Sequence, residues 1–241
     1  MKRYLSLIYG IATYAIFNAT FLYLVGFLGD FIVPKSLDSA PQVVWTQALI
    51  INVGLIMLFG IQHSVMARPW FKKMWTKIVP QHLERSTYVL FSSFALMILL
   101  YFWEPMGGTI WYVENTIAQI AIYSVFGLGW VLLLLSTFSI NHFDLFGLRQ
   151  VYLNFVNKPY TDVPFREPVL YRIVRHPLYL GFVFGVWATP HMTIAHLVLA
   201  LGFTIYILVG IHFEEKDLIT VFGDTYRKYK SAVPKLIPLP R

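Results

Sequence analysis

Long apolar runs separated by short polar segments dominate the chain. We expect membrane helices over residues 4–33, 45–65, 86–103 and 116–140, because each run is close to the roughly 20 residues that cross the hydrocarbon core of a bilayer. The first run follows Met1-Lys2-Arg3, is nearly twice as long as the apolar part of a signal peptide, and lacks a small-residue cleavage site. It therefore predicts a membrane helix that remains in the mature protein.

The last third of the chain follows a different pattern. The apolar run 178–189 is too short to cross a bilayer alone, and Pro190 interrupts it before the longer run 193–211. We interpret 178–211 as a tight helical hairpin whose first arm begins at Pro177, since proline is favoured in the first turn of a helix. The predicted fold is an all-α polytopic membrane protein with four spans and a C-terminal helical hairpin.

Composition supports this class of fold. Hydrophobic residues make up 57% of the chain and charged residues 13%, whereas soluble domains average about 45–50% and about 25%. Disordered, collagenous, coiled-coil and nucleic-acid-binding proteins are excluded. Cysteine is absent, so disulfides, thiolate metal sites, iron–sulfur clusters and a cysteine nucleophile are excluded as well.

The positive charges predict the orientation in the membrane. With four spans and a hairpin, every Lys and Arg except Lys35 falls on one face. The positive-inside rule makes that face cytoplasmic. We therefore expect both termini in the cytoplasm, most naturally at a bacterial inner membrane, and any site for a water-soluble cofactor at the cytoplasmic mouth.

The start of the hairpin carries a candidate anion site. Arg175 and His176 precede a helix that begins at Pro177, and the free N–H groups at such a helix start attract anions. Arg175 adds a bidentate donor, Tyr179 lies on the same side of the first turns, and Gly181 allows a backbone or a ligand to approach closely. The alternative is a basic membrane anchor followed by a helix-starting proline.

A second cluster lies at the end of the hairpin. The adjacent carboxylates Glu214 and Glu215 oppose the helix dipole, which favours cations at that end, so Arg172 or Arg175 should neutralise them. They form either a structural salt-bridge clamp, or a pair in which one carboxylate holds the arginine and the other binds a cationic or hydroxyl-rich ligand. Tyr226 and Tyr229 follow, three residues apart on a short predicted helix.

Taken together, these motifs resemble a known C-terminal signature. The order Arg-His-Pro-x-Tyr-x-Gly, Glu-Glu-x-x-Leu, Phe-Gly and Tyr-x-x-Tyr resembles integral-membrane methyltransferases, among them isoprenylcysteine carboxyl methyltransferases and phospholipid methyltransferases. The resemblance implies that S-adenosylmethionine binds at the mouth of the hairpin, beneath the tail. It implies cofactor contacts for Arg175, His176, Pro177, Tyr179, Gly181, Glu214, Glu215, Tyr226 and Tyr229.

The remaining polar segments narrow the resemblance. The segments 62–69, 84–88, 141–150 and 188–192 are similar to those of methanethiol S-methyltransferases, which make dimethyl sulfide. The first two also resemble NnrU-like membrane proteins, which are not expected to carry the full C-terminal signature. The resemblance implies one domain over 1–241, in which 1–165 serves the substrate and 166–241 binds the cofactor.

Methylation of a thiol requires a thiolate, because the neutral thiol is a weak nucleophile. His63, His142, Asp144 and Arg149 lie at predicted cytoplasmic span ends. Asp144 or His142 is our candidate proton acceptor, with Arg149 as an electrostatic aid and His63 next in line. The alternatives are hydrogen-bonded interfacial histidines and a cap or salt bridge at Asp144. We expect no metal site, because no two histidines have His-x-x-x-His spacing.

Three functions follow from these expectations. The first is methyl transfer from S-adenosylmethionine to a small thiol, with methanethiol as substrate and the lipid bilayer as surroundings. The second is methylation of a prenylcysteine carboxylate or a phospholipid amine at the same cofactor site. The third is a non-catalytic NnrU-like membrane protein. The basic residues are explained by orientation, so we expect no nucleic-acid partner.

Overall fold

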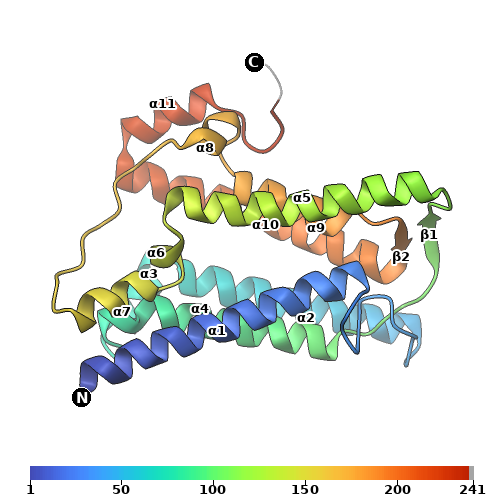
Figure 1. The fold of residues 1–241 in the computed structure, drawn as a ribbon, viewed down its shortest axis with the longest axis horizontal. Coiled ribbons are helices and arrows are strands. Elements are labelled where there is room, and N and C mark those ends of the chain that lie inside the picture. The colour runs from blue at the N-terminus through green and yellow to red at the C-terminus, as the bar shows by residue number, and fades with distance from the viewer. Residues whose placement is uncertain (239–241) are drawn as a thin grey trace. The chain divides into compact units, whose positions relative to one another are not determined.

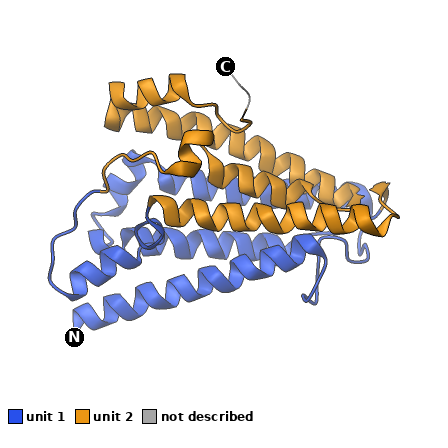
Figure 2. Ribbon diagram, turned by 45° about the horizontal axis from the view of Figure 1, so that its top comes forward, with its two compact units in different colours: residues 1–107, 141–162 blue, residues 108–140, 163–241 orange. Residues whose placement is uncertain are grey.

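A computed structural model describes residues 1–238. The chain forms two compact units, residues 1–107 with 141–162 and residues 108–140 with 163–241 (Figure 2). Each unit combines two separate stretches of the chain, so the unit boundary differs from the predicted sequence division at residue 165. Each unit is described on its own below.

Three long helices form the body of the first unit: α1 (Lys2–Gly29), α2 (Trp45–Ala67) and α4 (Gln81–Phe102). Both α1 and α2 pack on α4 (Figure 1). Three short helices, α3 (Pro69–Trp75), α6 (His142–Leu145) and α7 (Leu148–Phe155), complete this unit. Helix α7 packs on α1 and α4, which fixes the polar segment around His142 at one end of the three-helix body.

The second unit is built on the close packing of α5 (Thr116–Ile140) against α9 (Pro177–Trp187). A Cβ atom at Gly181 would lie 2.5 Å from the carbonyl oxygen of Gly129, so glycine is required where these two backbones meet. The long helix α10 (Ile194–Phe222) and the short helices α8 (Val169–Ile173) and α11 (Asp224–Ala232) complete the helical part of this unit.

Two features of the second unit differ from the sequence-based expectation. The turn of the hairpin contains strand β2 (His191–Thr193), which pairs antiparallel with β1 (Thr109–Tyr112). Helix α10 also continues to Phe222, well beyond the end of its apolar run at Ile211. Glu214 and Glu215 therefore lie within the last three turns of a continuous helix.

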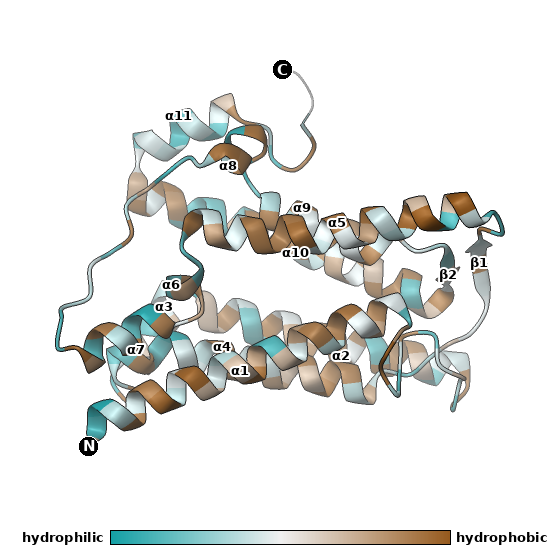
Figure 3. Ribbon diagram, viewed as in Figure 1, coloured by the Kyte–Doolittle hydropathy of each residue, from teal (hydrophilic) through white to brown (hydrophobic). Residues whose placement is uncertain are grey.

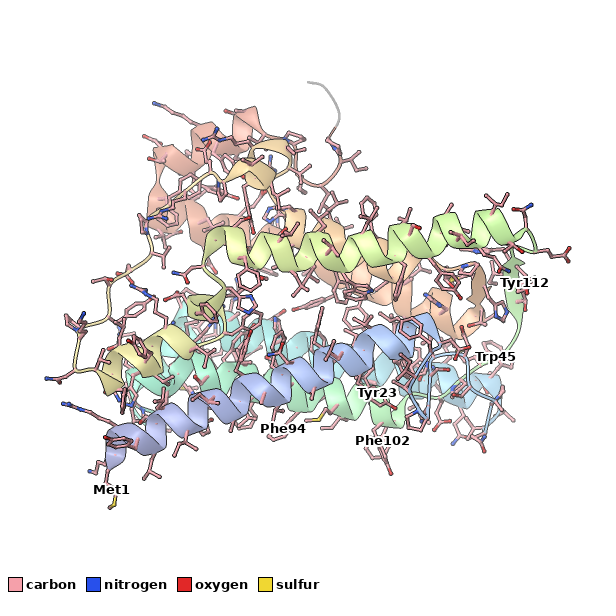
Figure 4. All side chains as sticks on the ribbon, viewed as in Figure 1. Met1, Tyr23, Trp45, Phe94, Phe102 and Tyr112 are labelled. Carbon is pink, nitrogen blue, oxygen red and sulfur yellow. The ribbon has the colours of Figure 1, made fainter. Side chains whose placement is uncertain are left out.

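The long helices expose apolar side chains. Phe94 and Phe102 of α4 project away from the helices (Figure 4) and are 43% and 54% exposed. Hydrophobic residues continue along the long helices, whereas α11 is largely hydrophilic (Figure 3). Within residues 1–238, five helices are long and apolar enough to cross a membrane: α1, α2, α4, α5 and α10. The predicted all-α architecture is confirmed, and the length and composition of these five helices indicate a multi-pass membrane protein.

Candidate active site

The start of α9 is tied to the C-terminal tail. His176 is the N-cap residue, with φ −127° and ψ 62°, and Pro177 is the first helical residue. This non-helical backbone is expected before proline. It directs the N–H groups of Arg175 and His176 to the carbonyl oxygens of Pro234 and Lys235, at 2.8 Å and 3.2 Å. The tail therefore folds back over the beginning of the hairpin.

Arg175 and Glu215 form a buried ion pair. The Nε and Nη2 atoms of Arg175 lie 2.9 Å and 2.8 Å from Oε1 of Glu215. Nη1 donates to the carbonyl oxygens of Lys230, at 2.9 Å, and Val233. Four of the five N–H groups of the guanidinium thus bind protein atoms. The fork predicted to receive an anion instead joins α9, α10 and the tail.

Two further groups bind Glu215. Lys230 of α11 places Nζ 2.8 Å from Oε2 of Glu215, and Nε2 of His176 lies 3.1 Å from Oε1. The side chain of Glu215 is only 5% exposed, and two cations and an imidazole offset its charge. We name Arg175, His176, Glu215 and Lys230 the hairpin clamp, and it is the salt-bridge clamp that the sequence predicted as one alternative.

Glu214 has different surroundings from its neighbour. Its side chain is 42% exposed and accepts a hydrogen bond of 2.9 Å from the hydroxyl of Tyr179. Nδ1 of His176 lies 3.9 Å from Oε2 of Glu214. A carboxylate with open surface beside a phenol can bind an ammonium or a pair of hydroxyls. Glu215 thus holds the arginine, as both sequence-based alternatives expected, and Glu214 keeps an exposed surface.

Aromatic side chains hold α11 in place. Tyr226 and Tyr229 are buried with Val233 against Phe165 and neighbouring apolar residues, and the Tyr229 hydroxyl donates to the carbonyl oxygen of Tyr171 at 2.6 Å. Burial raises the pKa of Tyr226, and raises that of Tyr229 to about 12. Both tyrosines are therefore neutral, and they close the tail over the hairpin clamp.

The sequence did not identify every residue of this site. Lys230, Phe165 and Tyr171 were missed. Lys230 directly follows the second tyrosine of the Tyr-x-x-Tyr motif and lies in the last turn of α11, which was the available signal. Arg172, the other predicted partner, donates its Nε to the carbonyl oxygen of Glu167 instead. Gly181 faces α5, so its close approach serves helix packing.

The second candidate segment, in the other unit, divides into two parts. His142 is 4% exposed, and its Nε2 lies 2.6 Å from the hydroxyl of Tyr14 on α1. Asp144 turns to other partners: Arg149 Nη1 lies 2.8 Å from Oδ1, and the Tyr160 hydroxyl donates to Oδ2 at 3.2 Å. The two candidate proton acceptors are thus two positions apart in sequence but have separate environments.

Arg149 also stabilises the loop after α7. Its Nη1 and Nη2 donate to the carbonyl oxygen and the Oγ1 of Thr161, at 2.9 Å and 2.7 Å. Its guanidinium lies over the ring of Tyr160 at 5.1 Å, a cation–π contact. The predicted salt bridge between Asp144 and Arg149 is therefore present, and it anchors residues 160–161.

His63 lies between α2 and α4. Its Nδ1 is 3.0 Å from Oγ of Ser92, its Nε2 is 2.7 Å from the hydroxyl of Tyr88, and its ring stacks on Phe59. Both ring nitrogens have partners on α4. This is the arrangement predicted for a hydrogen-bonded histidine at a span end.

Long apolar helices and a C-terminal hairpin held by the hairpin clamp are typical of multi-pass membrane proteins rather than of soluble enzymes. The family model described as NnrU protein matches residues 51–236. The matched range extends over the C-terminal segment that holds the Arg-His-Pro and Glu-Glu motifs of this chain. No solved structure matches the chain at a significant level.

Curated relatives match nearly the whole chain. A methanethiol S-methyltransferase of Crocosphaera subtropica is 54% identical over 99% of this chain and 93% of its own length. One of Mycobacterium tuberculosis is 51% identical over 100% of this chain and 98% of its own length. Nurim of Xenopus laevis is 28% identical over 80% of this chain and 73% of its own. The chain belongs to the NnrU family and, within it, to the methanethiol S-methyltransferases.

Proposed function

We propose that the protein transfers a methyl group from S-adenosylmethionine to the sulfur of methanethiol, which yields dimethyl sulfide. The observation that carries this proposal is the identity of about half of all positions with methanethiol S-methyltransferases across 99% of the chain. Their name supplies the acceptor. The name also implies a methyl donor. The residues beside the hairpin clamp support S-adenosylmethionine as that donor.

The residues at the hairpin mouth fit S-adenosylmethionine. That cofactor carries a carboxylate, an ammonium, ribose hydroxyls and a sulfonium, and it supplies a methyl group on a positively charged sulfur. Glu214 suits the ammonium or the ribose, because it is half-exposed and bound by only the Tyr179 hydroxyl and the more distant His176 in its unit. We assign direct contact to Glu214 and Tyr179.

The other predicted cofactor residues support this contact in our proposal. Arg175 and Glu215 are almost fully buried and bind each other, so they act as positioning residues that fix the start of α9 relative to the end of α10. The tyrosines of α11 close the site. The residues in this group are Arg175, His176, Pro177, Gly181, Glu215, Tyr226 and Tyr229.

His142 is the proton acceptor that the geometry favours. Burial lowers the pKa of His142 below its ordinary value, so the imidazole is neutral near pH 7 and able to accept a proton. Both oxygens of Asp144 accept hydrogen bonds already, and its pairing with Arg149 stabilises the loop. His63 serves α2–α4 packing in this proposal.

The reaction then balances as follows. The thiol gives its proton to His142 and keeps the electron pair. S-adenosylmethionine, when bound, would supply the methyl group: the thiolate sulfur would bond to the methyl carbon as the bond from that carbon to the sulfonium sulfur breaks. Two neutral thioethers and one imidazolium result. Alignment of the reacting atoms in line and exclusion of water supply much of the rate enhancement.

The membrane topology is part of the proposal. We infer four spans, α1, α2, α4 and α5, followed by the hairpin of α9 and α10, in one functional domain with both termini in the cytoplasm of a bacterium. Reporter fusions after Val79 and at the C-terminus should report cytoplasm, and fusions at Pro41 and Gly108 should report the outside. A cytoplasmic signal at Gly108 would contradict the span count.

One assay tests the function. Purified protein is incubated with methyl-labelled S-adenosylmethionine and either methanethiol or a prenylcysteine, and labelled dimethyl sulfide is measured in the headspace. Labelled dimethyl sulfide, lost in Glu214→Gln, is the expected result. Labelled prenylcysteine alone would assign the protein to the lipid-directed methyltransferases. Absence of both products and of cofactor binding by calorimetry would favour the non-catalytic alternative.

A further inference from the structure

Tyr14 is a polar residue inside a long apolar helix, and no sequence motif singles it out. Its hydroxyl lies 2.6 Å from Nε2 of His142, and the two rings meet edge to face at 5.7 Å. The contact joins α1 to α6 across 128 residues of sequence. We propose that Tyr14 is a positioning residue for the reaction, which holds the His142 imidazole in the tautomer that accepts the thiol proton.

The inference rests on the proposed function, in which His142 takes the proton. A neutral imidazole carries one N–H, and the hydrogen bond made by one nitrogen determines which nitrogen carries it. If Nε2–H donates to the Tyr14 oxygen, the basic lone pair lies on Nδ1. After proton transfer both nitrogens carry hydrogen, and the same Tyr14 oxygen stabilises the imidazolium.

The ring of His142 is fixed on more than one side. Phe146 lies 4.7 Å from it between ring centroids, and Phe146 in turn stacks on Phe17 of α1 at 4.2 Å. These apolar contacts explain the desolvation of the imidazole and leave Tyr14 as the polar partner from α1. A base with a fixed orientation accelerates proton transfer because no reorganisation precedes it.

Other charged groups near this segment have partners that set them apart from the imidazole. Arg85 of α4 donates its Nε to the carbonyl oxygen of Leu145 at 2.7 Å. Asp144 and Arg149 pair with each other, and Tyr160 donates to Asp144. In this unit Arg85 of α4, Asp144 of α6 and Arg149 of α7 thus contact groups other than the imidazole, and Tyr14 of α1 contacts its Nε2 directly.

The test compares two hydroxyl deletions on one helix. Tyr14→Phe removes the contact with His142, whereas Tyr9→Phe removes a 3.0 Å contact with Thr87. Turnover of methanethiol is measured from about pH 4.5 to pH 10 for both variants and for His142→Gln, because the acidic limb of a histidine whose pKa lies below its ordinary value of about 6.5 falls in the lower part of that range. Tyr14→Phe should lower kcat at least 10-fold with little change in the cofactor KM, and His142→Gln should lower kcat by about 10²–10⁴-fold. Tyr9→Phe should retain wild-type kcat.

The pH profile separates positioning from packing. Loss of the Tyr14 oxygen disfavours the imidazolium, so the acidic limb of kcat should move to lower pH in Tyr14→Phe. In His142→Gln this limb should disappear, and the deficit should shrink at high pH, where more thiolate forms without a base. The double variant should be no slower than His142→Gln, because both residues act through one group.

A second measurement does not depend on activity. The pKa of His142, read from ring-labelled histidine by NMR and assigned with His142→Gln, should fall in Tyr14→Phe and not in Tyr9→Phe. It also decides the outcome if Tyr14→Phe folds poorly, since the wild-type resonances report the Nε2–H tautomer directly. Wild-type kcat and an unchanged pH profile in Tyr14→Phe, or the Nδ1–H tautomer in the wild type, would overturn the inference. Neither result touches methyl transfer itself, which fails only if the wild type makes no dimethyl sulfide.

Discussion

Glu214 and Glu215 are adjacent and chemically identical, yet the structure predicts opposite consequences for the same substitution. Glu215→Gln should destabilise the protein with all of its clamp partners still in place. Glu214→Gln should leave stability nearly unchanged and weaken cofactor binding. The pair is a matched experiment, because each variant controls for the other in size, charge and helix position.

The magnitudes follow from burial and from the number of partners. The Glu215 carboxylate is 5% exposed and lies within 2.8–3.1 Å of Arg175, His176 and Lys230. Removing one partner of a buried ion pair costs about 3–5 kcal/mol, and a glutamine amide would also direct N–H groups at a cation. Glu214 is 42% exposed, so its loss should cost at most about 1 kcal/mol of stability.

Cofactor affinity should show the reverse order. A hydrogen bond to a charged group contributes about 1.5–3 kcal/mol, which corresponds to roughly 10- to 150-fold in the Kd of S-adenosylmethionine for Glu214→Gln. Tryptophan fluorescence during heating reports stability in detergent. Thiol-reactive dyes cannot be used, because the chain contains no cysteine. Titration calorimetry reports cofactor affinity.

Three results would refute this reasoning. If Glu215→Gln melts like the wild type and loses cofactor binding, Glu215 is the ligand and the clamp is not structural. If both variants lose stability equally, Glu214 contributes to the folded state as much as Glu215 does, although its side chain is 42% exposed. Full stability and full affinity in Glu214→Gln would remove that residue from the cofactor site.

Two further predictions concern packing and pH. Gly181→Ala should lower the melting temperature sharply, because its methyl group would lie 2.5 Å from the Gly129 carbonyl oxygen, whereas Gly127→Ala, with open space at its Cβ, should not; equal melting temperatures would contradict the close α5–α9 contact. Tyr229→Phe should be less stable than the wild type below pH 10, and the difference should shrink as pH rises from 10 through 12. The folded-state pKa of Tyr229 is raised to about 12 from about 10 in the unfolded chain, so its stabilisation is lost over that interval, and a constant difference would argue against a buried, neutral Tyr229.

The spans and the hairpin could be predicted because they depend on local properties of the sequence. Run length identified the long helices, and Pro177 marked the start of α9. The pairing of β1 with β2 joins strands about 80 residues apart and has no local signal. The extension of α10 beyond Ile211 was missed for a related reason. Residues 212–217 are mostly polar, and Glu215 is held there by ion pairs to Arg175 and Lys230 rather than by an apolar run.

Partners at the site were predictable only in part. The dipole argument correctly placed a cation beside the carboxylates, and Arg175 is that cation. Lys230 and the carbonyl oxygens of the tail could not be predicted, because they reach Glu215 only when the chain after Gly223 folds back. Tyr160 reaches Asp144 in the same way, from a loop 16 residues away.

The order of the two carboxylates shows what a motif leaves undetermined. Consecutive residues on an α-helix point about 100° apart, so only one of two adjacent glutamates can face both Arg175 and Lys230. The spacing of residues in the sequence does not determine which glutamate takes this inward-facing position. The fold-back of the tail decides, because it brings Lys230 to the inward side and neutralises the carboxylate found there. The other carboxylate then keeps its charge toward solvent, where a cationic ligand can reach it. A Glu-Glu pair therefore supplies both a clamp and a binding group from one helical turn.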